Sequence, residues 1–131
     1  LKFLVFMHSQ GISLGPHVTG DNFLVERKEH YVVAFDLTHV VRHSEGVVPL
    51  DFAREDVSRA AEEVIFVLGG SRVTGDMPAD EYDPDNAYQR CLCSLACGDE
   101  SSATRAHENF YALIRSLWPS AYWPYTTHPL D

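Results

Sequence analysis

Short apolar segments and one amphipathic segment make up the first half of the chain. The apolar segments have the β-branched and aromatic content typical of strands, and they are Lys2–Met7, Phe23–Val25, Tyr31–Leu37 and Val64–Leu68. Tyr31–Phe35 is apolar without alternation, as expected of a central parallel strand that is covered on both faces. Apolar residues recur at helical spacing from Ala53 to Val64, which predicts a helix over Phe52–Glu63 with Asp51 as its cap.

The second half begins with an acidic loop over residues 74–86, where proline and turn-forming residues are frequent. The segment Arg90–Cys97 is compatible with two structures. It suits a helix that begins at Asp83-Pro84 and ends at Gly98, or a short buried strand. Apolar residues at helical spacing from Ala103 to Leu117 predict a further helix, capped by Ser101 or Ser102 and ending before Pro119.

Strands that alternate with helices predict an α/β fold, with a mostly parallel sheet flanked by helices. We expect Lys2–Met7, Tyr31–Leu37 and Val64–Leu68 to be neighbouring strands of that sheet. A chain of 131 residues is long enough for one buried core, so a single α/β domain is predicted over residues 1–131. It would consist of a front part (1–73), the acidic loop (74–86) and a back part (87–131).

The charge balance narrows the range of partners. A formal net charge of −9 argues against nucleic acid and anionic membranes, because both require a basic surface. No apolar run approaches the roughly 18 residues needed to span a bilayer. The first residues, LKFLVFM, lack the basic region and cleavage site of a signal peptide.

Three cysteines, Cys91, Cys93 and Cys97, lie close together. An odd number at this spacing is a poor disulfide framework and fits a reducing compartment, which predicts a cytoplasmic location. With His107 they could form a metal site, but the spacing matches no common zinc motif. We therefore interpret them as small buried thiols and predict no metal.

Several segments, taken in order, resemble parts of an α/β-hydrolase. KFLVFMHSQG is similar to the strand that leads to the oxyanion hole, and FDLTHVVRHSEG is similar to the segment after the next strand. GGSRV resembles the G-x-S-x-G turn that carries the nucleophile. CLCSLACGDES resembles the strand that ends at the catalytic acid, and LWPSAYWPYTTHPLD the final segment with the histidine. The chain looks like a shortened or incomplete relative of that superfamily.

The resemblance implies a Ser-His-Asp triad in which Ser71 is the nucleophile, His128 the base and Asp99 the group that orients His128. The implied roles around the triad are an oxyanion hole at Ser9, Gln10 and Arg72, and pocket positions at His8 and Asp36. The implied activity is that of an esterase-like serine hydrolase, which acts on small acyl esters without a cofactor. His8, Asp36 and Ser71 are then expected at one end of the sheet.

Each of these residues also has a structural interpretation. Gly69-Gly70-Ser71 is compatible with a plain turn, Asp99 with a helix cap, and His128 with an exposed loop. The second functional hypothesis is a noncatalytic α/β-hydrolase-like domain that binds a partner around the acidic loop. Apolar surface left by a shortened sheet would be covered by a homodimer or by an absent partner segment.

Overall fold

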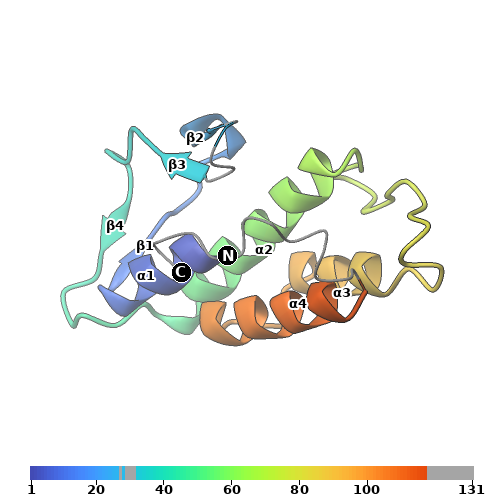
Figure 1. The fold of residues 1–131 in the computed structure, drawn as a ribbon. Coiled ribbons are helices and arrows are strands. Elements are labelled where there is room, and N and C mark those ends of the chain that lie inside the picture. Colours follow the sequence, from blue (N-terminus) through green and yellow to red (C-terminus); the bar gives the residue numbers. More distant parts are fainter. Residues whose placement is uncertain (27, 29–31, 118–131) are drawn as a thin grey trace.

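The fold is built mainly from helices, as a computed structural model shows for residues 1–26, 28 and 32–117 (Figure 1). The helices are α1 (Lys2–Ser9), α2 (Leu50–Val67), α3 (Ala87–Ala96), α4 (Ala103–Leu117) and the short 3-10 helix η1 (Gly20–Asn22). The strands are β1 (Ile12–Ser13), β2 (Phe23–Val25), β3 (Val32–Ala34) and β4 (Val41–Arg42). Among the described residues they form two antiparallel pairs, β1 with β4 and β2 with β3.

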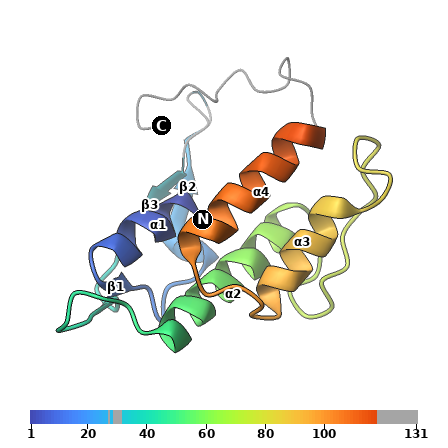
Figure 2. The same ribbon diagram turned by 90° about the horizontal axis from the view of Figure 1, so that it is seen from below.

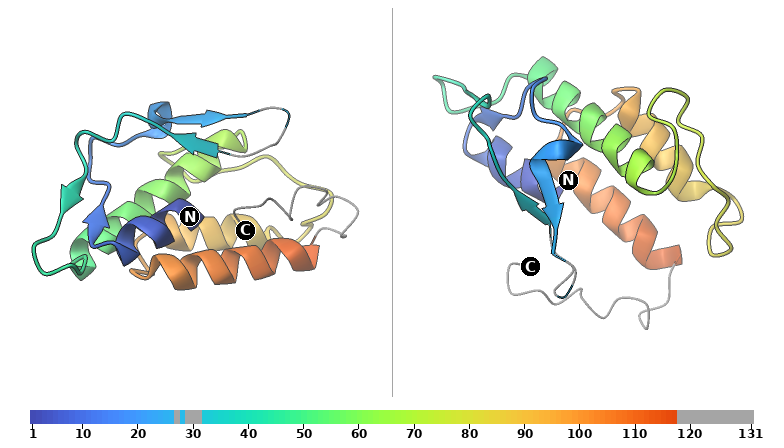
Figure 3. Two further views of the ribbon diagram at one scale, coloured as in Figure 1. Left: turned by 60° about the vertical axis from the view of Figure 1, so that its left-hand side comes forward. Right: turned by 90° about the horizontal axis from the view of Figure 1, so that it is seen from above.

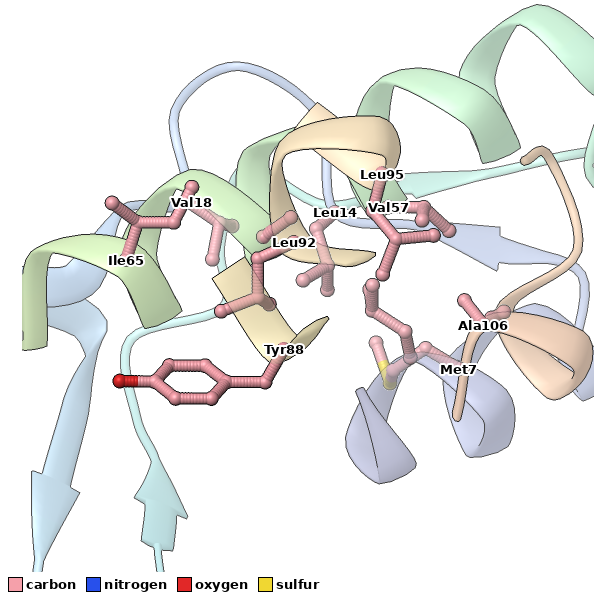
Figure 4. Packing of buried hydrophobic residues seen from close by; sticks show 12 residues of the cluster. Met7, Leu14, Val18, Val57, Ile65, Tyr88, Leu92, Leu95 and Ala106 are labelled. Atoms are coloured by element: carbon pink, nitrogen blue, oxygen red, sulfur yellow. The ribbon is translucent and has the colours of Figure 1, made fainter. Parts of the chain in front are cut away.

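The core lies between the helices. α2 packs along α3, while α4 packs against both α1 and α3, so that α4 crosses the assembly beside α1 (Figure 2). Side chains from α1, α2, α3 and α4 meet in one buried cluster, part of which Figure 4 shows. Its most deeply buried members are Leu4, Val57, Ala61, Ile65, Leu92 and Ala106.

The predicted α/β fold with a mostly parallel sheet is wrong, because two of the expected strands are helical. Lys2–Met7 lies in α1, where Leu4 and Met7 are buried on one face at a spacing of three residues. Val64–Val67 forms the end of α2, and Leu68 follows it directly. Ile65 is buried on the same stripe as Val57 and Ala61. No glycine or proline stands between Glu63 and Leu68 to stop the helix, so the apolar run extends it.

The third expected strand is short and lies at the surface. Of the range Tyr31–Leu37, Val32–Ala34 forms β3, which pairs antiparallel with β2 and not with a parallel neighbour. Val32 and Val33 are exposed, so this segment is no central strand. The strand predicted at Phe23–Val25 is confirmed as β2. Tyr31 lies outside the described residues.

The helix that ends at Val67 is closed by glycine. The Gly70 N–H donates to the Ile65 carbonyl at 2.8 Å, and the Gly69 N–H donates to the Phe66 carbonyl at 3.0 Å. Gly69 has a φ of +87°, and together these features form a Schellman motif. The sequence Gly69-Gly70-Ser71 therefore terminates a helix and does not form a strand-to-helix elbow.

The helix predicted from Ala103 to Leu117 is confirmed as α4, and of the two structures left open for Arg90–Cys97 the helix is the one that forms, as α3. The buried Asp83 carboxylate accepts the N–H groups of Ala87 at 2.7 Å and Tyr88 at 3.0 Å, so it caps α3. Gly98 follows the other end of α3 with a φ of +83°. The Ser102 hydroxyl accepts the Arg105 N–H at 3.2 Å and caps α4. The alternative of a strand within Arg90–Cys97 is wrong.

Candidate functional site

Ser71, the predicted nucleophile, organises a tight loop after α2. Its Oγ accepts the N–H groups of Val73 and Thr74, each at 3.2 Å. Its main chain closes the same loop, because the Ser71 N–H donates to the Asp76 carbonyl at 2.9 Å and the Gly75 N–H to the Ser71 carbonyl at 2.8 Å. The hydroxyl thus has the role of a turn-forming side chain.

Asp99, the predicted acid, lies at the other end of α2. It is exposed and accepts the Ser94 hydroxyl at 2.6 Å. The preceding Gly98 lies against Arg54 near the start of α2, whereas Gly70 lies against Ile65 near its end. A helix rises about 1.5 Å per residue, which separates Arg54 from Ile65 by roughly 16 Å. Ser71 and Asp99 are therefore not brought together, and His128 lies outside the described residues.

The predicted oxyanion-hole residues are also dispersed. The Ser9 hydroxyl donates to the Phe6 carbonyl at 2.6 Å, and the Gln10 side chain donates to Ser9 Oγ at 3.3 Å. These two residues end α1, and a helix C-terminus presents carbonyl groups, which would repel an oxyanion. Arg72 is near the end of α2, pairs with Glu63 at 2.8 Å and covers the Phe66 ring. The C-terminal ends of α1 and α2 lie on opposite sides of the molecule (Figure 1).

The expectation that His8, Asp36 and Ser71 lie at one end of a parallel sheet is wrong, because they follow different kinds of element. His8 lies in the last turn of α1, Ser71 follows α2, and Asp36 comes after the short strand β3. Asp36 has a left-handed backbone with a φ of +52°, and its carboxylate accepts the Thr38 hydroxyl at 2.8 Å. Asp36 thus forms a turn at the end of the β2–β3 pair.

The most connected polar side chain of the described core is Asp56, which sequence reasoning missed. It is only 3% exposed and accepts the N–H groups of Leu14 at 2.8 Å and Gly15 at 3.1 Å. His8 Nε2 contacts the same carboxylate at 2.9 Å. The available signal was an acid directly beside Val57 on the apolar stripe of the predicted helix, since a buried acid requires partners. Asp56 ties α2 to α1 and to the segment after β1.

A serine and a histidine do lie within hydrogen-bonding distance elsewhere. Ser13 Oγ and His43 Nε2 are 2.9 Å apart, and the His43 ring packs edge-on against Phe52. Ser13 is 0% exposed, so no substrate reaches its hydroxyl. The pair links β1 to β4, as does the bond from the His43 N–H to the Gly11 carbonyl. We interpret it as a structural contact.

The three cysteines are free thiols on and just after α3. Burial raises the pKa of Cys91. Burial, with smaller contributions from Cys97 and Asp76, raises the pKa of Cys93. Raised pKa values keep the Cys91 and Cys93 thiols protonated and poorly nucleophilic. Among residues 1–26, 28 and 32–117, no group of three or more His, Cys, Asp or Glu side chains is arranged to hold a metal. Within the same residues, no helix is long and apolar enough to cross a membrane.

The β2–β3 hairpin carries several large apolar side chains that are exposed. Leu24 and Val33 are directly paired across the strands, and Phe35 lies diagonally beyond them on the same face. We call these three residues the hairpin face. Their exposures are 60%, 42% and 43%. An antiparallel sheet normally turns polar side chains to water on its outer face, so this apolar outer face is a candidate binding surface.

Both edges of this hairpin are open within the described part of the chain, because β2 and β3 pair only with each other. The strands lie on the outside of the helical assembly, as two further views show (Figure 3). On the opposite face of the hairpin, Val25 and Val32 are 65% and 62% exposed. Phe23, on that same face, packs edge-to-face against Phe3 and anchors the hairpin on α1.

Charges mark the two ends of the hairpin differently. Asp21 precedes β2 and Asp36 follows β3, and the register places both at the end where the strands meet the helices. Both aspartates are exposed, and so is Lys28 in the connection at the far end. The apolar strip therefore has a negative end, whereas the connection at its far end, ERKEH, contains two acids and two bases.

Comparison with known proteins supplies no relative for this arrangement. No protein-family model matches the chain, and the searches of curated proteins and of solved structures give no significant match.

Proposed function

We propose that the chain is a noncatalytic interaction domain whose β2–β3 hairpin binds an extended segment of another protein as a third strand. The observation that carries this proposal is the apolar outer face of a hairpin whose two edges pair with no other strand among the described residues. A two-stranded sheet is marginally stable in water, and a third strand would both complete the sheet and cover its face.

The hydrogen-bond pattern identifies the backbone groups that would bind such a strand. The Phe35 N–H donates to the Asn22 carbonyl at 2.9 Å, so Asn22 and Phe35 face each other as a hydrogen-bonded pair. Pairs alternate along an antiparallel ladder, which directs the N–H and C=O groups of the next residues outward. Val25 on β2 and Ala34 on β3 therefore point these groups away from the hairpin.

The charges specify the chemistry of the partner. An apolar segment with alternating large side chains would lie over the hairpin face. A lysine or arginine at one end of that segment would meet Asp21 and Asp36. The net charge of −9 also favours a basic partner over a second copy of this chain.

A library of random decapeptides displayed on phage tests this proposal with the full chain as bait. We expect enrichment of peptides with alternating Val, Ile or Phe and a terminal Lys or Arg. Val25→Pro and Ala34→Pro each remove one outward N–H, and one of the two should abolish binding of a selected peptide. Val25→Ala and Ala34→Ser are the matched controls and should bind normally. Peptides that bind both proline variants like the wild type would contradict strand addition.

The serine hydrolase hypothesis remains an untested prediction, and the arrangement of Ser71 gives it no support. A fluorophosphonate probe labels activated serines, since it requires a deprotonated hydroxyl. We expect no labelling of this chain under conditions in which a known serine esterase reacts completely. Labelling that disappears in Ser71→Ala but persists in Ser9→Ala would contradict the noncatalytic proposal.

A further inference from the structure

Two histidines face each other at the base of the hairpin. The ring centres of His17 and His39 are 5.2 Å apart and the planes are tilted by 49°. Both side chains are exposed. His17 lies in the segment that leads into η1 and β2, whereas His39 lies in the segment that leaves β3. The pair therefore brackets the hairpin.

Both histidines are carried by segments that are anchored to the core. Val18, next to His17, is buried, and the N–H groups of Leu14 and Gly15 just before it are held by Asp56. Val40, next to His39, packs against the buried cluster. Because the backbone beside each histidine is held by the core, no flexible loop has to become ordered to bring the two imidazoles together.

The geometry points to a metal site, and we propose that His17 and His39 together bind a transition-metal ion such as Zn²⁺, with water completing its coordination. Two imidazoles that share one tetrahedral Zn²⁺ at Zn–N distances of about 2.0–2.1 Å have ring centres about 5 Å apart. The observed separation agrees with this value. Imidazole suits zinc, copper and nickel, and it discriminates against Mg²⁺ and Ca²⁺, which prefer oxygen.

A metal at this position would cross-link the two ends of the segment that carries the hairpin. The chain between the two histidines contains η1, β2 and β3, and a bound ion would close that loop at its base. The hairpin is otherwise tied to the helices through few side chains, among them Phe23. The inference does not depend on the hairpin binding a partner, because the ring separation on which it rests is a feature of the free chain.

Titration of the full chain with ZnCl₂ tests the site, by calorimetry and by NMR of the imidazole side chains. We expect one Zn²⁺ per chain, with the resonances of His17 and His39 shifting together. His17→Gln and His39→Gln should each weaken Zn²⁺ binding by about tenfold or more, because even losing a residue that only supports a ligand costs this much. His107→Gln is the matched control and should bind like the wild type, and MgCl₂ should have no effect.

Hydrogen exchange gives a second readout, in which Zn²⁺ should slow exchange of the β2 and β3 amides in the wild type but not in His17→Gln. The proposal is overturned if Zn²⁺ does not bind, or if it binds equally well to His17→Gln and His39→Gln. Either result would leave strand addition unaffected, since peptide binding is measured without metal.

Discussion

The helical core and the β2–β3 hairpin use apolar residues in opposite ways. In the core, Val57, Ala61 and Leu92 are completely removed from solvent by helices on several sides. In the hairpin, Leu24 and Val33 are similar in size and polarity but are 60% and 42% exposed. Burial of apolar area stabilises the fold only in the first case. The comparison indicates that the helices carry the stability of the chain and leave the hairpin available for binding.

Leu92→Ala should have the largest effect on stability, because it deletes a side chain that is 0% exposed between α2, α3 and α4. We expect the free energy of unfolding to fall by about 3 kcal/mol, within the usual range for a buried leucine. Urea denaturation followed by circular dichroism measures the change. Leu24→Ala is the matched control and should change it by less than about 0.5 kcal/mol. Equal losses for the two variants would break the distinction between core and hairpin.

Asp56→Ala should be the next most damaging substitution, because it strips the N–H groups of Leu14 and Gly15 of their acceptor inside the protein. Unsatisfied buried donors predict a loss of about 2–3 kcal/mol in the free energy of unfolding. His8→Ala removes only one partner of the same carboxylate and should cost about 1 kcal/mol. A larger loss for His8→Ala than for Asp56→Ala would show that the histidine is the main contact.

Asp83→Ala should have a smaller effect, since it removes the cap of α3 but leaves the apolar cluster between the helices intact. Losing the bonds to Ala87 and Tyr88 predicts a fall of about 1–2 kcal/mol in the free energy of unfolding. Asp85→Ala, in the same turn but exposed, is the control and should be nearly neutral. The measurement is again urea denaturation. An unchanged stability in Asp83→Ala would mean that α3 is held by packing alone.

The last helix was predictable because its local signals agreed, whereas α3 was predictable only as one of two alternatives. The stripe from Ala103 to Leu117 has one period, and α3 has an acid before it and a glycine after it. α1 and the end of α2 were not predictable in the same way. Short apolar runs such as Lys2–Met7 and Val64–Leu68 do not distinguish strand from helix, and packing against other helices decided the outcome.

The candidate site was predicted poorly for a related reason. A glycine pair followed by serine suits both a nucleophile turn and a helix C-cap, and only the preceding element distinguishes the two. Once Val64–Leu68 is helical, Gly69 becomes the residue that ends α2. The exposure of the hairpin face could not be predicted from the sequence, for a different reason. An apolar run in sequence indicates burial, but at Val32 and Val33 the fold leaves the residues exposed.

Val33→Lys tests the central claim most directly, because it changes the middle of the hairpin face without touching the core. Lysine can keep its charge in water at an exposed strand position, so the free energy of unfolding should change by less than about 0.5 kcal/mol. A peptide selected on the wild type, followed by fluorescence anisotropy, should lose at least about tenfold in affinity, which corresponds to about 1.4 kcal/mol. Unchanged peptide affinity in a fully stable Val33→Lys protein would contradict the claim that the hairpin face is the binding surface.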